Sequence, residues 1–574
     1  TRKLTDSAYP KRKQAADEVA ERVRKAAGNP VEVQRILTCL QVQFLDTSAS
    51  ACCKKGGLIG LASMALGLQD SVDDFLPQLV KPVLELLKDE EPRVRYYACE
   101  ALYNISKAVN DKVLIHLKEI FEGLCKLHAD VDHEVRRGAN VLDRLMKDIA
   151  TLHPEKLRSE SFVPLIAERA KFKNPYVRQL VLAWIKLLMD MKEVDIVQYL
   201  PLYLEGLFSM LGDQSRDIRH NANECLEHLL KALTVGGAAT EARMQIVANT
   251  AGIVVKHCDV GTDPNARLTA LMWLNEYINL HTRAPREASE PHQKKWIGML
   301  QELVKGTLKG FDDEHEAIAR MAEENNSRML ALAKNLGSNL PVDQLLNQLQ
   351  ASLDEAKNSS VVRGVCFQWM CALIVSSADP QIRKKILDNF GDLIFQTLLE
   401  NDDEVMKNAL VVLESIMEGR RDSQQDTCDD VDLFDVVADR LLVVFRRDTL
   451  EEKGLDMIRH LCQHLNARRL YVTVARAVQK ETSELDFAQH LVQTFSWILF
   501  TAPQTKALRE ELLQPIPASA SVAPGASTER QDTPLFLELL EAWFHNPVSA
   551  LALCLWAQQY ELANAVTARL AAFE

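Results

Sequence analysis

A Val-Arg or Ile-Arg pair recurs at a nearly constant interval along the first half of this 574-residue chain. The arginines of its clearest copies stand 41, 42 and 41 residues apart; they are Arg95, Arg136, Arg178 and Arg219. Counting back by the same interval reaches Lys54 and then Arg12, and looser copies follow at Arg267 and Arg363. A period of roughly 40–47 residues is typical of HEAT and armadillo arrays, whose helical hairpins bury their apolar faces against neighbouring hairpins. The period therefore predicts an all-α fold, an α-solenoid of HEAT or armadillo type.

Each expected unit has an apolar helical segment on either side of a short polar turn. Residues 113–130 precede one such turn and residues 133–149 follow it, and both carry apolar residues at helical spacing. Aspartates at the turns are expected to accept from exposed amides at helix starts; they are Asp89, Asp132, Asp213 and Asp263. Prolines at the turns suit the first helical position, where an amide proton would be unpaired anyway; they are Pro92, Pro175 and Pro264.

The regularly spaced arginines allow two interpretations. A row of guanidinium groups suits phosphates and anionic headgroups. The arginines also recur at one structural position beside recurring acids, and that pattern favours hydrogen bonds and ion pairs between repeats. We therefore predict that Arg95, Arg136, Arg178 and Arg219 are structural repeat positions, with phosphate binding as the alternative.

Changes in composition predict where the repeats are interrupted. We expect a solenoid over residues 1–420, an acidic loop over 421–432, further helical repeats without the Val-Arg pair over 433–513, a Pro/Ala/Ser-rich linker over 514–533, and a C-terminal helical region over 534–574. Asn546 is a candidate N-cap, with Pro547 in the first helical turn. The second helix of this last region is apolar almost all round, which predicts a covered face. The candidate surface for a partner or a second copy comprises Trp543, Phe544, His545, Asn546, Pro547, Leu553 and Trp556.

No residue pattern in the chain predicts catalysis, a metal or a cofactor. Gly56-Gly57 lacks the Lys-Ser/Thr that follows a phosphate-binding loop, and no nucleophile elbow occurs. His460 and His464 stand four apart, but the glutamate of a HExxH zinc site is missing. We therefore predict a binding protein and not an enzyme.

Charge and cysteine usage constrain the partners and the compartment. A net charge of −13 opposes general binding to nucleic acid. The twelve cysteines include no CxxC pair, which favours a reducing, cytoplasmic environment. The longest apolar runs fall short of the roughly 18 residues that cross a bilayer, so no membrane-spanning segment is expected.

Several segments resemble one known family, the ArPIKfyve family of HEAT-repeat scaffolds. The similar stretches are "KKGGLIGLASMALG" (54–67), "RVRYYACEALYNI" (93–105), "VLDRLMKDI" (141–149), "YLPLYLEGLFSMLGD" (199–213) and "WFHNPVSALALCLWAQQYELA" (543–563). The Val-Arg turns are general HEAT features, whereas the Lys-Lys-Gly-Gly run and the His-Asn-Pro-Val hairpin are far more specific. The resemblance extends over nearly the whole chain, and the family continues with further helices where this chain ends at Glu574.

The resemblance implies a non-catalytic scaffold. Such a scaffold holds a phosphatidylinositol 3-phosphate 5-kinase of the PIKfyve type together with a Sac-domain phosphoinositide phosphatase, and so regulates synthesis and turnover of phosphatidylinositol 3,5-bisphosphate. It also implies a homo-oligomer, a pentamer, formed through the C-terminal region. The expected location is the cytoplasmic face of endosome, vacuole and lysosome membranes, reached peripherally through partners. The alternative is a HEAT-repeat adaptor of the nuclear-transport or protein-phosphatase regulatory type, which would share the repeats but not the C-terminal hairpin.

Overall fold

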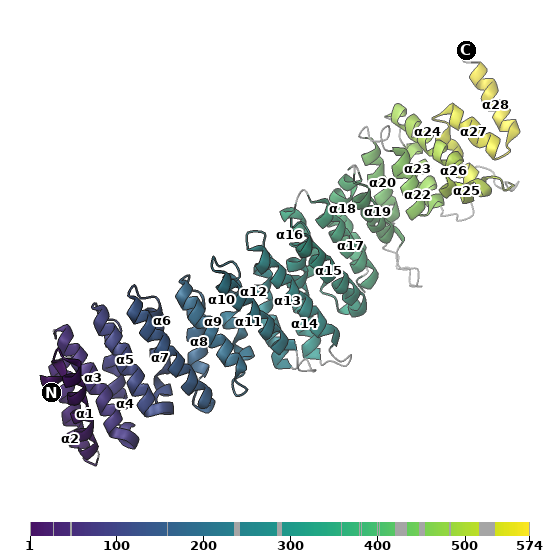
Figure 1. Ribbon diagram of the computed structural model, residues 1–574. Helices are drawn as coiled ribbons and strands as arrows, with labels where there is room; N and C mark the ends of the chain where they lie inside the picture. The colour runs from purple at the N-terminus through teal and green to yellow at the C-terminus, as the bar shows by residue number, and fades with distance from the viewer. Residues whose placement is uncertain are drawn as a thin grey trace. The chain divides into compact units, whose positions relative to one another are not determined.

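The structure of the chain is a computed structural model that consists of helices (Figure 1). It describes residues 2–26, 28–45, 49–157, 159–234, 241–283, 290–356, 359–377, 379, 381–398, 400, 402–418, 433–446, 454–480, 484–515 and 534–572. Within these ranges there is no β-strand. The chain divides into two compact units, Thr1–Gly306 and Thr307–Glu574. The predicted loop 421–432 and residues 516–533 of the predicted linker lie outside the described residues.

The described part of the first unit contains fourteen α-helices. They are α1 (Tyr9–Ala26), α2 (Pro30–Phe44), α3 (Ala51–Leu68), α4 (Leu76–Leu86), α5 (Pro92–Val109), α6 (Leu117–His128), α7 (His133–Leu152), α8 (Ser159–Ala170), α9 (Pro175–Asp190), α10 (Leu200–Met210), α11 (Arg216–Thr234), α12 (Glu241–Lys256), α13 (Pro264–Arg283) and α14 (Glu290–Leu308). A short 3₁₀ helix, η1 (Arg2–Thr5), precedes α1.

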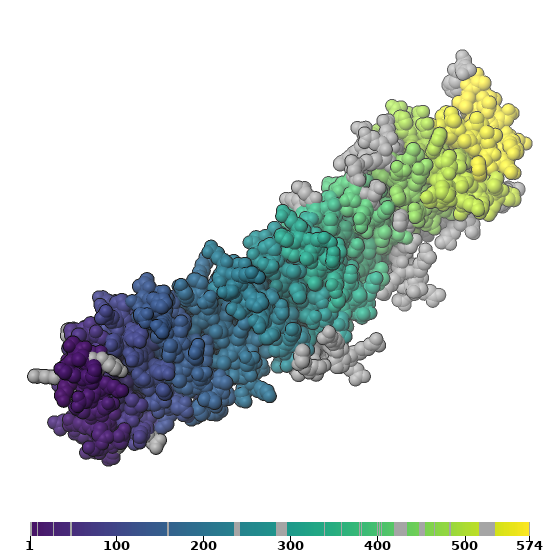
Figure 2. Space-filling view, viewed as in Figure 1, coloured from purple at the N-terminus to yellow at the C-terminus, as the bar shows by residue number. Residues whose placement is uncertain are grey.

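These helices form two parallel rows, as the repeat period predicts. One row contains α3, α5, α7, α9, α11 and α13, each packed on the next, and the other contains α4, α6, α8, α10 and α12. Each helix of the second row also packs on the helix that follows it in the chain, which completes a hairpin. The α-solenoid prediction is therefore confirmed, and in the space-filling view neighbouring hairpins of this unit meet in a continuous surface (Figure 2).

The core of the first unit lies between the rows. In α5, Val94, Ala98, Leu102 and Ile105 recur three or four residues apart, so they share one face of the helix, and all four are completely buried. Because each hairpin has such a face and no closed core of its own, its stability comes from the hairpins on either side.

Helix α3 packs unusually closely against its neighbours. A Cβ atom added at Gly67 would lie 2.5 Å from the Ala20 carbonyl oxygen, and one at Gly57 would lie 2.6 Å from a Leu45 methyl carbon. The glycines in this helix therefore allow close inter-helix contact. By length and composition α3 is also the one described helix that is long and apolar enough to cross a membrane, which the count of apolar runs missed; 61% of it is buried inside the fold. Its apolar character is explained by contacts with α1, α2 and α5.

The predicted turn residues have two different roles. Asp132 caps α7, because its side chain accepts from the amides of Glu134 and Val135 at 2.9 and 3.1 Å. Asp89 and Asp213 instead accept from the amide two residues later, inside the turn that precedes the helix. They are turn acids and not N-caps, which corrects the expectation for these two residues.

The second unit begins with regular hairpins and continues with shorter helices. Its α-helices are α15 (Glu316–Leu336), α16 (Val342–Glu355), α17 (Ser360–Ser376), α18 (Ile382–Thr397), α19 (Asp403–Glu418), α20 (Leu433–Phe445), α22 (Gly454–His464), α23 (Ala467–Lys480), α24 (Leu485–Thr501), α25 (Lys506–Leu512), α26 (Leu535–Trp543), α27 (Pro547–Trp556) and α28 (Tyr560–Ala571). Helix α26 packs on α23, α27 packs on α24 and α26, and α28 packs on α27. Ala563 is the buried residue of α28.

Candidate partner-binding sites

The repeated arginines tie each turn to the next one. Arg95 donates to the carbonyl oxygens of Asp89 and Glu90 in its own turn, at 2.8 and 2.9 Å. Its Nε and second terminal nitrogen donate to both carboxylate oxygens of Asp130 in the following turn, at 2.7 and 2.9 Å. Lys54 pairs with Asp89 at 2.8 Å, and Arg178 pairs with Asp213. In all three pairs the acid lies 35 residues after the cation.

Two of the four arginines bond only their own turn in the contacts that the structure describes. Arg136 donates to the carbonyl oxygens of Asp130 and Val131, and Arg219 donates to those of Asp213 and Gln214. Thirty-five residues after Arg136 the chain has Lys171 and not an acid. Arg136 instead lies 5.7 Å from the Tyr176 ring centroid. Arg12, reached by counting back, makes the same pair of turn bonds, to the carbonyls of Asp6 and Ser7. These arginines are therefore structural, which answers the phosphate-binding alternative.

The Arg95–Asp130 pair predicts a dependence of stability on pH. Burial alone would raise the pKa of Asp130, but hydrogen bonds from Arg95 and the Asp132 amide outweigh it and hold the pKa below its usual value. A lowered folded-state pKa stabilises the fold above the unfolded pKa of about 3.9, and this contribution is lost as the pH falls through the folded value. Asp130→Asn should cost about 2 kcal/mol at pH 7 and little at pH 2. Urea unfolding at both pH values measures this, and an equal cost at both would contradict it.

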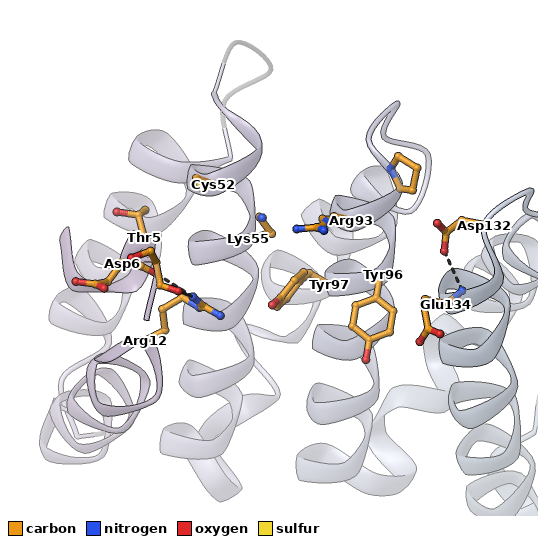
Figure 3. A pocket seen from close by; sticks show the side chains of 12 residues that line it. Thr5, Asp6, Arg12, Cys52, Lys55, Arg93, Tyr96, Tyr97, Asp132 and Glu134 are labelled. Carbon is orange, nitrogen blue, oxygen red and sulfur yellow. Dashed lines mark hydrogen bonds between the residues drawn. The ribbon is translucent and has the colours of Figure 1, made fainter. Parts of the chain in front are cut away.

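An open groove of about 560 Å³ lies beside this row of ion pairs, at the N-terminal ends of α1, α3, α5 and α7. Figure 3 shows the side chains that line it. They come from four successive parts of the chain: Thr5, Asp6, Ser7 and Arg12; Cys52 and Lys55; Pro92, Arg93, Tyr96 and Tyr97; and Asp132 and Glu134. The groove therefore exists only because the first three hairpins stack.

The centre of the groove is aromatic and basic, and its rim is acidic. The Tyr96 and Tyr97 rings meet edge to face, with centroids 5.8 Å apart. The Lys55 ammonium lies 5.7 Å from the Tyr97 ring centroid, and Arg93 is exposed nearby. Partial burial, with smaller effects of Glu100 and Glu134, raises the pKa of Tyr96, so its phenol stays neutral at physiological pH. Sequence reasoning missed this groove; the available signal was a second cation beside each structural one, at Lys54-Lys55 and at Arg93/Arg95.

The residues predicted as a C-terminal surface divide between the interior and the exterior. Trp543 and Leu553 are 1% and 0% exposed, and Asn546 is buried as the N-cap of α27, where it accepts from the Ser549 amide at 3.0 Å. The capping prediction is thus confirmed. His545 is half-buried, and its Nδ1 lies 3.0 Å from the Ala542 carbonyl oxygen.

The exterior of the same region is apolar. Phe544, Pro547 and Trp556 are exposed, and Val548 and Tyr560 are exposed beside them. Trp556 packs obliquely on Phe500 with ring centroids 5.4 Å apart, and its indole N–H donates to the Arg509 carbonyl oxygen at 3.3 Å. Of the predicted residues, Phe544, Pro547 and Trp556 are therefore the ones available to a partner.

The reactive groups of the described residues are used in packing. Burial raises the pKa of the Cys99 and Cys366 thiols to about 12, so neither is a thiolate at neutral pH. No three His, Cys, Asp or Glu side chains within the described ranges lie close enough together to hold a metal ion. His460 is half-buried, and the His464 side chain lies outside the described residues.

Two family models match separate parts of the chain. Residues 52–148 match the vacuolar 14 Fab1-binding region, which includes most of the groove residues. Residues 447–574 match the C-terminal region of vacuolar protein 14 that binds its Sac phosphatase partner, which includes α22 to α28.

Comparison with known proteins extends this similarity to the whole chain. The protein VAC14 homolog of Arabidopsis thaliana is 32% identical over 569 residues, covering 98% of this chain and 70% of the relative. Vacuole morphology and inheritance protein 14 of Saccharomyces cerevisiae is 24% identical, covering 100% of this chain and 77% of the relative. Among solved structures, the karyopherin Kap121p bound to the SUMO protease Ulp1p is 13% identical, covers 97% of this chain and 55% of that chain, and has a TM-score of 0.30, too low to inform function. The name ArPIKfyve does not occur among these relatives, but the resemblance is confirmed at a broader level: the chain belongs to the VAC14 family.

Proposed function

We propose that this protein is a scaffold that holds a Fab1-type phosphatidylinositol 3-phosphate 5-kinase and a Sac-type phosphoinositide phosphatase in one complex. The observation that carries the proposal is the match of two different family regions, one described as binding Fab1 and one as binding the phosphatase, to residues 52–148 and 447–574. The two regions belong to different compact units of the chain. A chain that binds two opposing enzymes through separate units can keep them together without competition for one surface.

The chemistry of the complex is assigned to the partners. The conspicuous cations of the repeats, such as Arg95 and Arg178, bond neighbouring turns and so maintain the solenoid. By holding kinase and phosphatase together, the scaffold would regulate both synthesis and turnover of phosphatidylinositol 3,5-bisphosphate. We place it peripherally, through its partners, on vacuole, endosome and lysosome membranes; the support is the name of the yeast relative, a vacuole morphology and inheritance protein.

Self-association through the C-terminal region is part of the proposal. The exposed side chains of Phe544, Val548 and Trp556 form an apolar surface on α27 and the turn before it. Exposed apolar surfaces of this kind are typical of interfaces. If a pentamer forms here, light scattering on the full chain should give about five times the monomer mass, and Phe544→Asp with Trp556→Asp should lower it. Val131→Asp, at a 90% exposed position in the first unit, is the matched control and should leave the mass unchanged.

Affinity capture from cells tests the scaffold function. Tagged full-length protein should recover the kinase and the phosphatase together. Recovery of a nuclear-transport GTPase with neither enzyme would instead support the alternative, a nuclear-transport adaptor. Recovery of each enzyme only in the absence of the other would contradict a shared scaffold.

A further inference from the structure

Two cations of the N-terminal groove have no carboxylate partner among the described residues. Lys55 and Arg93 line the groove, and neither forms an ion pair in that part of the chain. Their close neighbours in sequence, Lys54 and Arg95, pair with acids of the next turn. The solenoid therefore uses Lys54 and Arg95 for folding and leaves Lys55 and Arg93 directed into the groove (Figure 3).

The position of these cations on their helices is unfavourable without an anion. Arg93 lies in the first turn of α5, and Lys55 begins the second turn of α3. A helix N-terminus carries partial positive charge, which repels a nearby cation. At α5 the N-cap residue, Glu91, makes no side-chain capping bond that would offset this repulsion. An anion in the groove would interact favourably with both side chains and with both helix ends.

We propose that the groove binds an acidic peptide segment of the kinase, an inference that rests on the proposed function. A carboxylate of the segment would lie between Lys55 and Arg93, where it forms charge-assisted hydrogen bonds. An adjacent apolar or aromatic side chain of the segment would pack on Tyr96 and Tyr97, whose rings line the same groove. The groove also lies within the matched Fab1-binding region, apart from its wall of Thr5 to Arg12.

The acidic rim favours a peptide over a membrane surface as the occupant. Asp6, Asp132 and Glu134 line the groove beside the cations. A flat anionic bilayer would bring its charge against these acids as well as against Lys55 and Arg93, and the net charge of −13 adds to the repulsion. An extended peptide can place one acid between the cations and a neutral or basic residue at the rim.

Charge reversal in the full-length protein tests the proposal. Lys55→Glu with Arg93→Glu should weaken binding of purified full-length kinase at least about tenfold, because like charges then meet at the interface. Lys81→Glu with Lys118→Glu is the matched control: it changes the net charge equally, at two exposed residues of α4 and α6 with no ion pair among the described residues, and should leave the Kd unchanged. If the reversed protein does not fold, Lys55→Gln with Arg93→Gln replaces it. Equal weakening by the control pair, or wild-type affinity of the groove variant, would overturn the inference.

Crosslinking and flotation identify the occupant. A photoreactive phenylalanine at position 97 should crosslink to a kinase segment in which Asp and Glu outnumber Lys and Arg. A neutral or basic segment, or no crosslink to bound kinase, would overturn the inference while the scaffold function stands. Absence of any binding between the wild-type protein and the kinase would overturn both. Flotation with vesicles that contain phosphatidylinositol 3-phosphate should show no binding that depends on Lys55 and Arg93; such binding would assign the groove to lipid.

Discussion

Leu102→Arg should destabilise the N-terminal repeats by about 4 kcal/mol or more. Leu102 is completely buried on the face of α5 that contains Ala98 and Ile105. Helix α5 packs on α3, α4 and α7, so an arginine here would place an unpaired charge between hairpins. Removing a buried leucine side chain alone costs about 2–5 kcal/mol, and burying an uncompensated charge adds several more. Chemical denaturation monitored by helical circular dichroism measures the loss.

The same variant should separate the two partners. Because a solenoid hairpin is stabilised by its neighbours, local unfolding at α5 disrupts the adjacent repeats before distant ones. Kinase binding should therefore be lost while phosphatase binding persists. Leu152→Arg is the matched control, since Leu152 is 71% exposed and its replacement should change stability by no more than about 0.5 kcal/mol. An unchanged denaturation midpoint for Leu102→Arg would show that this face of α5 does not contribute to the core.

Trp543→Ala should destabilise the C-terminal helices by about 3–5 kcal/mol. Trp543 is 1% exposed, and its ring stacks on that of Tyr471 with centroids 6.3 Å apart. Helix α26 packs on α23, so the truncation would leave a cavity between these helices. The indole N–H has no hydrogen-bond partner in the structure, so its removal reduces the loss only slightly. Thermal unfolding of the full chain should show a lower midpoint for the transition of this region.

Trp556→Ala provides the contrast. Trp556 is 38% exposed and loses only its packing on Phe500 and one hydrogen bond at 3.3 Å. We expect a loss of stability of about 1 kcal/mol, together with weaker phosphatase binding or self-association if this surface is an interface. Similar destabilisation by both substitutions would contradict the assignment of Trp543 to the interior and Trp556 to the surface.

Much of the fold was predictable from the sequence because a solenoid is built from contacts between neighbouring repeats. The spacing of Arg95, Arg136, Arg178 and Arg219 identified the repeat, and the structure places all four in equivalent turns. Asn546 was predictable as an N-cap because capping depends on residues only a few positions apart. The expectation that aspartates cap helices was wrong for Asp89 and Asp213, because their oxygens bond the turn and the cation of the preceding repeat.

The sequence by itself determined the helical period, the hairpin boundaries and the family, since each depends on local spacing or on directly comparable residues. The tertiary structure decided which side chains face inward. It placed Trp543 in the core and Trp556 at the surface, although both occur in one apolar stretch, because neighbouring helices cover only one side of that hairpin. It also assembled the groove, whose cations Lys55 and Arg93 are 38 residues apart in the chain and meet only when α3 and α5 stack. Periodicity locates such residues on a helix, but the packing of adjacent hairpins determines which of them share a site.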